Sequence, residues 1–146
     1  ILKIYGNGNK EDFYSRIEKN NCQDTCFLYD AVSDLSAKLV EGSIFAFSSR
    51  FEGFGMVITE AMACGVPPVA FACPCGPVDI ISNGINGLLV PPNDIEALAD
   101  KINYLIENEG YRKEMGKFAR KRAERFKIEI IAEEWITLFQ SLINKN

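Results

Sequence analysis

The stretch SIFAFSSRFEGFGMVITEAMACGVPPVAFA, residues 43–72, contains a strand, a glycine-rich turn, a helix and a second strand. Its first seven residues are apolar enough for a strand that is buried on both faces of a sheet. Residues 55–65 carry apolar side chains at helical spacing and end at Gly65, the residue type that most often follows a helix. This order of elements predicts a parallel sheet with right-handed crossover helices.

The same alternation of strands and helices extends to both sides of this stretch. Further strands are expected at residues 1–6, 25–29 and 86–90, and helices at residues 10–19 and 34–42, with one helical turn within 73–84. The chain therefore has the pattern of an α/β fold, a doubly wound parallel sheet of the Rossmann-like type.

The last third of the chain is expected to be helical. Asn93, with Glu96 three residues later, fits a capping box that opens a helix. Its predicted apolar stripe consists of Ile95, Leu98, Ala99, Ile102, Leu105 and Ile106. A second helix covers residues 111–125, and a third presents a one-sided apolar pattern that includes Trp135. We expect this last helix to pack away from the core of the sheet.

Composition limits the function classes that this chain can serve. Its 146 residues are 47% hydrophobic and 25% charged, which is typical of one globular domain covering residues 1–146. The net charge of −4 argues against a nucleic-acid partner, which would need a dense basic surface. The chain has no histidine, so it offers no Cys/His metal site and no Ser-His or Cys-His nucleophile pair. Its five cysteines follow no zinc spacing and are interpreted as reduced thiols of a cytoplasmic protein.

The turn in the opening stretch is placed where doubly wound sheets bind ligands, beyond the carboxyl end of a strand. We call the Gly-Phe-Gly turn, residues 53–55, the elbow. Its glycines allow close approach of a ligand to the backbone. The free amides of Gly55, Met56 and Val57 would face outward from the helix N-terminus and form an anion site suited to a diphosphate.

Two glutamates, eight positions apart, flank the elbow. Glu60, on the helix, is placed to accept hydrogen bonds from vicinal hydroxyls such as those of a ribose, and Glu52 from a second hydroxylated group across the phosphates. On spacing alone an alternative stays open, in which Glu60 only complements the helix dipole and Glu52 is only solvated.

EGFGMVITEAMACGVPPVA resembles the Glu-x7-Glu signature of retaining GT-B glycosyltransferases, in particular the family 4 group of bacterial enzymes. IYGNG, IFAFSSRFEGFG, CGPVDIISNGINGLLVPPND and an Arg-Lys-Glu-Met-Gly stretch follow in the order of that family, so the similarity runs from about Leu2 to the C-terminus. The resemblance implies that the chain is the C-terminal, donor-binding half of a GT-B enzyme with a helical tail.

The resemblance also implies roles for individual residues. Glu52 would bind the hydroxyls of the transferred sugar as the catalytic-site acid, and Glu60 the ribose. The elbow and the start of the helix would hold the sugar and diphosphate, and the loop at the end of the second strand would flank the base. The residues implied are Gly53, Phe54, Gly55, Met56 and Val57 for the donor, and Leu28, Tyr29 and Asp30 for the base.

The activity implied is transfer of a hexose-type sugar, with retention, from a nucleotide sugar to a glycan or lipid-linked acceptor, as in bacterial polysaccharide biosynthesis. The donor is expected to be a UDP-sugar, with no metal and no other cofactor. In such enzymes the domain begins one strand and one helix earlier, with an Arg and a Lys that hold the diphosphate, and an N-terminal acceptor domain precedes it. We therefore expect residues 1–146 to be a fragment that is inactive alone.

Three alternatives to this interpretation differ in how well the sequence supports them. A dinucleotide-binding domain lacks support because Gly6 and Gly8 are not followed by a third glycine at position 11. A sugar-nucleotide epimerase would need catalytic acids and histidines that this chain does not provide. A non-catalytic nucleotide-sugar-binding or interaction domain of the same fold stays open.

Residues 111–127 hold eight Lys or Arg against two Glu. They form either a solvated helix face or a peripheral contact with the inner face of the membrane.

Overall fold

The computed structural model describes residues 1–144 and divides the chain into two compact units. The N-terminal unit is Ile1–Leu35, and the C-terminal unit begins at Ser36. Within the described residues no helix is long and apolar enough to cross a bilayer.

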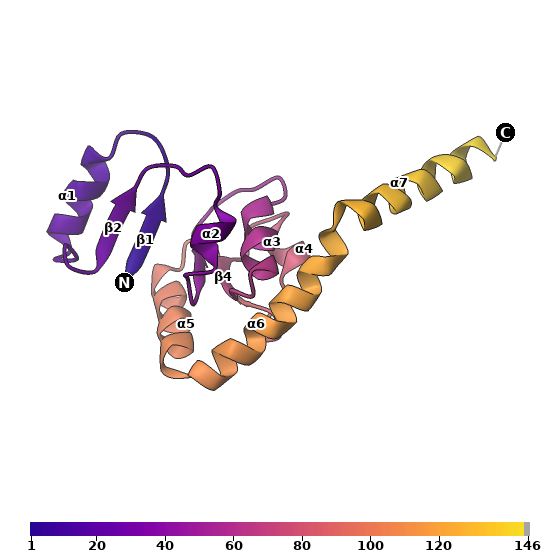
Figure 1. Cartoon of the computed structure of the whole chain (residues 1–146). Helices are drawn as coiled ribbons and strands as arrows, with labels where there is room; N and C mark the ends of the chain where they lie inside the picture. The colour runs from indigo at the N-terminus through magenta and orange to yellow at the C-terminus, as the bar shows by residue number, and fades with distance from the viewer. Residues whose placement is uncertain (145–146) are drawn as a thin grey trace. The chain divides into compact units, whose positions relative to one another are not determined.

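The N-terminal unit consists of two parallel strands and one helix (Figure 1). Strand β1 (Leu2–Tyr5) pairs with β2 (Cys26–Tyr29), and helix α1 (Glu11–Lys19) connects them. Leu2 lies opposite Cys26, and Tyr5 lies opposite Tyr29. The three elements that the sequence predicted here are therefore present at the expected places.

The C-terminal unit contains a second parallel sheet, in the order β3-β4-β5, with helices around it (Figure 1). Its strands are β3 (Phe45–Phe47), β4 (Pro68–Phe71) and β5 (Leu88–Val90). Its helices are α2 (Ser36–Leu39), α3 (Met56–Ala63), α4 (Pro77–Ile80), α5 (Ile95–Glu107), α6 (Glu109–Ala123), the 3-10 helix η1 (Glu124–Phe126) and α7 (Ile128–Ile143). Parallel strands with flanking helices and a helical C-terminal region confirm the predicted fold class.

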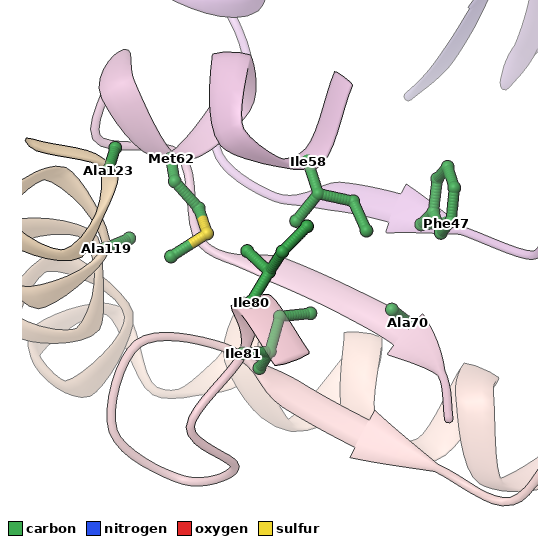
Figure 2. Close-up of a cluster of buried hydrophobic side chains, with 8 residues drawn as sticks. All are labelled: Phe47, Ile58, Met62, Ala70, Ile80, Ile81, Ala119 and Ala123. Atoms are coloured by element: carbon green, nitrogen blue, oxygen red, sulfur yellow. The ribbon is translucent and has the colours of Figure 1, made fainter. Parts of the chain in front are cut away.

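Strand β4 is buried on both faces, as its apolar sequence predicts. Val69 and Phe71 point to one face, where they pack with Leu98 and Leu105 of α5. Ala70 points to the other. The cluster on that second face, drawn in Figure 2, consists of Phe47, Ile58, Met62, Ala70, Ile80, Ile81, Ala119 and Ala123. Helices therefore cover both faces of this sheet, which is the doubly wound arrangement.

The turn that ends α3 has the glycine conformation that the sequence predicts. Gly65 has a φ of +77° and donates its N–H to the Met62 carbonyl, while Val66 donates to the Ala61 carbonyl. These two bonds form a Schellman motif. Helix α6 crosses directly over this turn, because a Cβ on Gly116 would overlap the Gly65 carbonyl oxygen.

The basic residues of α6 have a structural role that the sequence analysis missed. Arg112 donates to the Leu105 and Ile106 carbonyls at the end of α5, and Arg120 donates to Ala63 at the end of α3. Arg122 donates to the Asp79 and Ile80 carbonyls at the end of α4. Cations at helix C-termini satisfy unpaired carbonyls and complement the helix dipole. Three of the arginines in residues 111–127 therefore stabilise the fold instead of only facing solvent.

The predicted capping residue of α5 is wrong by one position. Asn93 has a φ of +66°, and the N-cap is Asp94, whose carboxylate accepts the Ala97 N–H at 2.9 Å. The buried stripe is also narrower than predicted, since Ile95 and Ile106 are exposed. Only Leu98 and Leu105 of this helix are buried, so α5 contributes fewer side chains to the core than the sequence predicts.

Helix α7 lies outside the core of the sheet, as expected (Figure 1). None of its described residues is buried, and Trp135 is 54% exposed and packs on Phe139 of the same helix. A row of apolar side chains on α7 is therefore presented to its surroundings.

Candidate functional site

The elbow joins β3 to α3 in a conformation that depends on glycine. Gly55 is the N-cap of α3 and has φ +85° and ψ +53°, the left-handed region. A Cβ there would also lie 3.2 Å from the Ile58 side chain. The Ile58 N–H donates to the Gly55 carbonyl at 2.9 Å, so the amides of Gly55, Met56 and Val57 precede the first bond of the helix. These three amides are the ones that the sequence analysis selected.

The loop that follows β4 packs closely against the elbow. Gly76 has a φ of +67°, and a Cβ on it would overlap the Phe54 carbonyl oxygen, 2.8 Å from Phe54 C and 3.4 Å from Glu52 Cβ. Burial raises the pKa of the Cys73 thiol, and the negative charges of Glu52 and Cys75 raise it further. The carboxyl ends of β3 and β4 therefore bring two loops together at one edge of the sheet, as expected for a ligand site.

The two glutamates are partly exposed and are not used by the internal structure. Within residues 1–144 neither carboxylate makes a hydrogen bond or an ion pair. Glu60 is on α3 beside the buried Ala61, and Glu52 lies against Gly76 through its Cβ. Glu60 is thus held on a helix and Glu52 on the loop before it, and both have acceptor oxygens available. In the described part of the chain no group of three or more His, Cys, Asp or Glu is placed to bind a metal.

The rest of the elbow is open to solvent. Gly53 is exposed, and a Cβ on it would meet no atom within 4 Å. Phe54 and Met56 are 40% and 68% exposed, while Val57 packs partly on the core. The Phe54 ring contacts Phe126 of η1 edge-on, with centroids 5.5 Å apart. The sequence analysis gave no role to Phe126, because its contact spans residues far apart in the chain.

The three residues predicted to flank the base belong to the N-terminal unit. Leu28 and Tyr29 line a hollow of about 430 Å³, and the Tyr29 ring stacks on Tyr5 at 4.9 Å. The Asp30 carboxylate accepts a hydrogen bond from the Lys10 ammonium at 2.6 Å. This hydrogen bond and the positive charge of Lys10 lower the pKa of Asp30.

Of the predicted site residues, seven surround the start of α3 and three lie in the N-terminal unit. The seven are Glu52, Gly53, Phe54, Gly55, Met56, Val57 and Glu60. This arrangement offers amides to an anion and carboxylates to hydroxyl groups, the chemistry that the sequence predicts for a nucleotide sugar.

Comparisons with known proteins identify the family of this chain. The family model "Glycosyl transferases group 1" matches residues 1–122. The chain is 34% identical to the poly(ribitol-phosphate) alpha-N-acetylglucosaminyltransferase of Staphylococcus aureus, over 94% of this chain and 28% of that protein. It is 33% identical to an exopolysaccharide phosphotransferase of Streptomyces coelicolor, over 99% of this chain and 16% of that protein.

A solved structure shows the same fold. The crystal structure of HepE from Anabaena in complex with UDP matches with a TM-score of 0.89 and 25% identity, over 95% of this chain and 40% of that chain. The chain thus spans well under half the length of these relatives. Because the family model covers most of the sequence, this chain belongs to the group 1 glycosyl transferases.

Proposed function

We propose that this chain is the donor-binding part of a retaining glycosyltransferase that transfers a hexose-type sugar from a nucleotide sugar to a glycan or lipid-linked acceptor. The observation that carries the proposal is the elbow, where unpaired amides at the start of α3 are flanked in the sequence by two glutamates whose carboxylates make no hydrogen bond or ion pair within the described residues. In this proposal the amides hold the diphosphate, Glu60 the ribose and Glu52 the transferred sugar.

The nucleotide is proposed to be a uridine diphosphate. HepE, which shares this fold, has been solved with UDP bound. Leu28, Tyr29 and Asp30 are the residues proposed to flank the base. No metal is proposed, because helix amides and cationic side chains can neutralise a leaving diphosphate.

We propose that residues 1–146 belong to a longer enzyme and lack activity by themselves. In the described residues β3 has a strand neighbour on one side only, and so has β1. Each of these edges can accept a further parallel strand. This is consistent with a longer enzyme in which the domain has one more strand and helix outside residues 1–146. In this proposal the earlier strand and helix of the donor domain would supply the Arg and Lys that hold the diphosphate, and an N-terminal domain of the same protein would supply the acceptor site.

Two substitutions in the full-length protein test the assignment of the glutamates. Glu60→Ala should weaken UDP binding by about tenfold to a hundredfold, since a hydrogen bond to a charged acceptor contributes roughly 1.5–3 kcal/mol. Glu52→Ala should leave UDP affinity nearly unchanged and reduce sugar transfer, because its partner is the sugar. Calorimetric titration with UDP, GDP and ADP, alongside transfer rates from the matching sugar nucleotides, gives both quantities.

The outcomes separate the rival interpretations. Small and equal effects of both substitutions on binding and rate would refute the donor-site proposal and favour two solvated acids. A loss of UDP affinity in Glu52→Ala instead of Glu60→Ala would mean that the donor lies across the elbow in the opposite direction. UDP-sugar binding without transfer to any glycan or lipid-linked acceptor would favour the non-catalytic binding domain.

We also propose that the lysines of α6 allow a peripheral contact with an anionic membrane surface. The arginines of this helix bond to carbonyls, whereas Lys117 and Lys121 line an outer hollow of about 570 Å³ with Phe118. Sedimentation with phosphatidylglycerol vesicles should fall when both lysines are replaced by glutamine, and phosphatidylcholine vesicles should show no binding. Equal sedimentation of the unmodified protein and the double glutamine variant with phosphatidylglycerol vesicles would contradict this contact.

A further inference from the structure

We propose that Phe126 and Arg122 are positioning residues that hold the elbow in its ligand-binding conformation. This inference rests on the proposed function of the elbow and deepens it, because it assigns a role to residues of η1 and α6. Neither residue is placed in contact with the donor. Both act through Phe54, whose backbone forms the turn between the two glutamates.

The first contact of this arrangement is between two rings. The Phe126 ring meets Phe54 at 5.5 Å between centroids and 68° between planes, the edge-to-face geometry that aromatic pairs favour. Phe126 itself is half-buried and packs against the core cluster of α3, α4 and α6 that Figure 2 shows. The exposed elbow is thus tied to a fixed part of the unit.

Arg122 fixes the Phe126 ring from the other side. Its guanidinium lies 5.4 Å from the ring centroid, within the range of a cation–π contact. The same guanidinium donates to the Asp79 carbonyl at 2.9 Å and to the Ile80 carbonyl at 3.1 Å. Two hydrogen bonds and a ring contact restrict a planar guanidinium in a way that a lysine ammonium cannot reproduce.

These contacts connect the elbow, α4, Arg122 and Phe126 to one another. Helix α4, whose last carbonyls bind Arg122, begins directly after Gly76. Gly76 in turn lies against the Phe54 carbonyl so closely that no Cβ fits. Phe54 is therefore held by its backbone from the α4 side and by its ring from the η1 side, and Arg122 connects the two. A turn held at both ends presents its amides in one geometry, which binding of a diphosphate requires.

Hydrogen exchange in the full-length protein without ligand tests this arrangement directly. Phe126→Leu keeps an apolar side chain but removes the ring, and should accelerate exchange of the Ile58 amide, which donates to the Gly55 carbonyl of the elbow, about twofold to tenfold. Phe126→Tyr keeps the ring and should restore slow exchange. The control is Phe118→Leu on α6, a phenylalanine that is 45% exposed and lines an outer hollow with Lys117 and Lys121.

A second pair of variants tests whether Arg122 does more than stabilise the end of a helix. Arg122→Lys should accelerate exchange of the Ile58 amide, whereas Arg120→Lys should not, although Arg120 also bonds to the end of a helix. In the double variant Phe54→Leu with Phe126→Leu, the effect should equal that of the Phe126 variant alone, because one contact is lost only once. In the variants with faster exchange, UDP affinity should also fall, by about twofold to tenfold.

Each result decides between positioning and packing. Unchanged exchange of the Ile58 amide in Phe126→Leu overturns the inference, and so does an equal increase in the Phe118 control. An increase spread evenly over α3 and β4 would mean that Phe126 only stabilises the core, which also overturns it. If exchange responds as expected but the unmodified protein binds no nucleotide diphosphate, the positioning stands and the proposed function fails.

Discussion

Gly76→Ala is the substitution by which the structure predicts the largest disturbance of the elbow from a single methyl group. Gly76 has a positive φ and lies against the Phe54 backbone, where a Cβ would overlap the carbonyl oxygen. The added carbon must displace either the elbow or the start of α4, because both neighbours are backbone atoms. We therefore expect a loss of stability together with a shift of the amides proposed to bind the diphosphate.

The magnitude follows from two separable contributions. An alanine at such a positive φ costs about 1–3 kcal/mol through backbone strain alone. The overlap adds about 1–3 kcal/mol, the usual cost of forcing one extra carbon into a packed site. Gly84→Ala is the matched control, because Gly84 has a φ of +81° and nothing within 4 Å of an added Cβ. It should show the first cost without the second.

The assay has a structural and a functional part. Urea-dependent hydrogen exchange of the α3 amides should give a greater loss of local stability for Gly76→Ala than for Gly84→Ala, by about 1–3 kcal/mol. Sugar transfer should fall by up to about a hundredfold for Gly76→Ala, as displacement of a site by about 1 Å can cause, and stay near normal for Gly84→Ala. Equal losses of stability in the two variants would refute the reasoning, since the contact with Phe54 would then have no measurable cost.

Three further predictions concern other parts of the chain. Asp94→Ala should destabilise α5 by about 1 kcal/mol, seen as faster exchange in its first turn, because the side-chain cap is lost. Native alkylation should modify the exposed Cys75 and spare Cys73, which is buried and has a raised pKa, until the protein unfolds. Lys10→Ala should raise the pKa of Asp30 toward its ordinary value in an NMR titration, so that its carboxylate protonates at higher pH.

The sequence by itself determined the elements of this protein and the type of its fold. Strands, helices and the turn after α3 follow from hydrophobic periodicity and from glycine at Gly65, signals that act between residues close in the chain. The same local reasoning predicted an anion site at the helix start beyond β3. Local reasoning could not choose between neighbouring residues, as the N-terminus of α5 shows. Asn93 and Asp94 are both good capping residues, and only the backbone conformation selects Asp94.

Only the tertiary structure decided how the elbow is held. Arg122 donates to Asp79 and Ile80, more than 40 residues earlier, and Phe126 meets Phe54, which lies still further away in the chain. In the sequence Arg122 is one of many cations in a basic run, and nothing in its neighbours distinguishes it from the lysines that face solvent. Packing of α6 across the ends of three other helices makes that distinction, because unpaired carbonyls at those ends attract the arginines that can reach them.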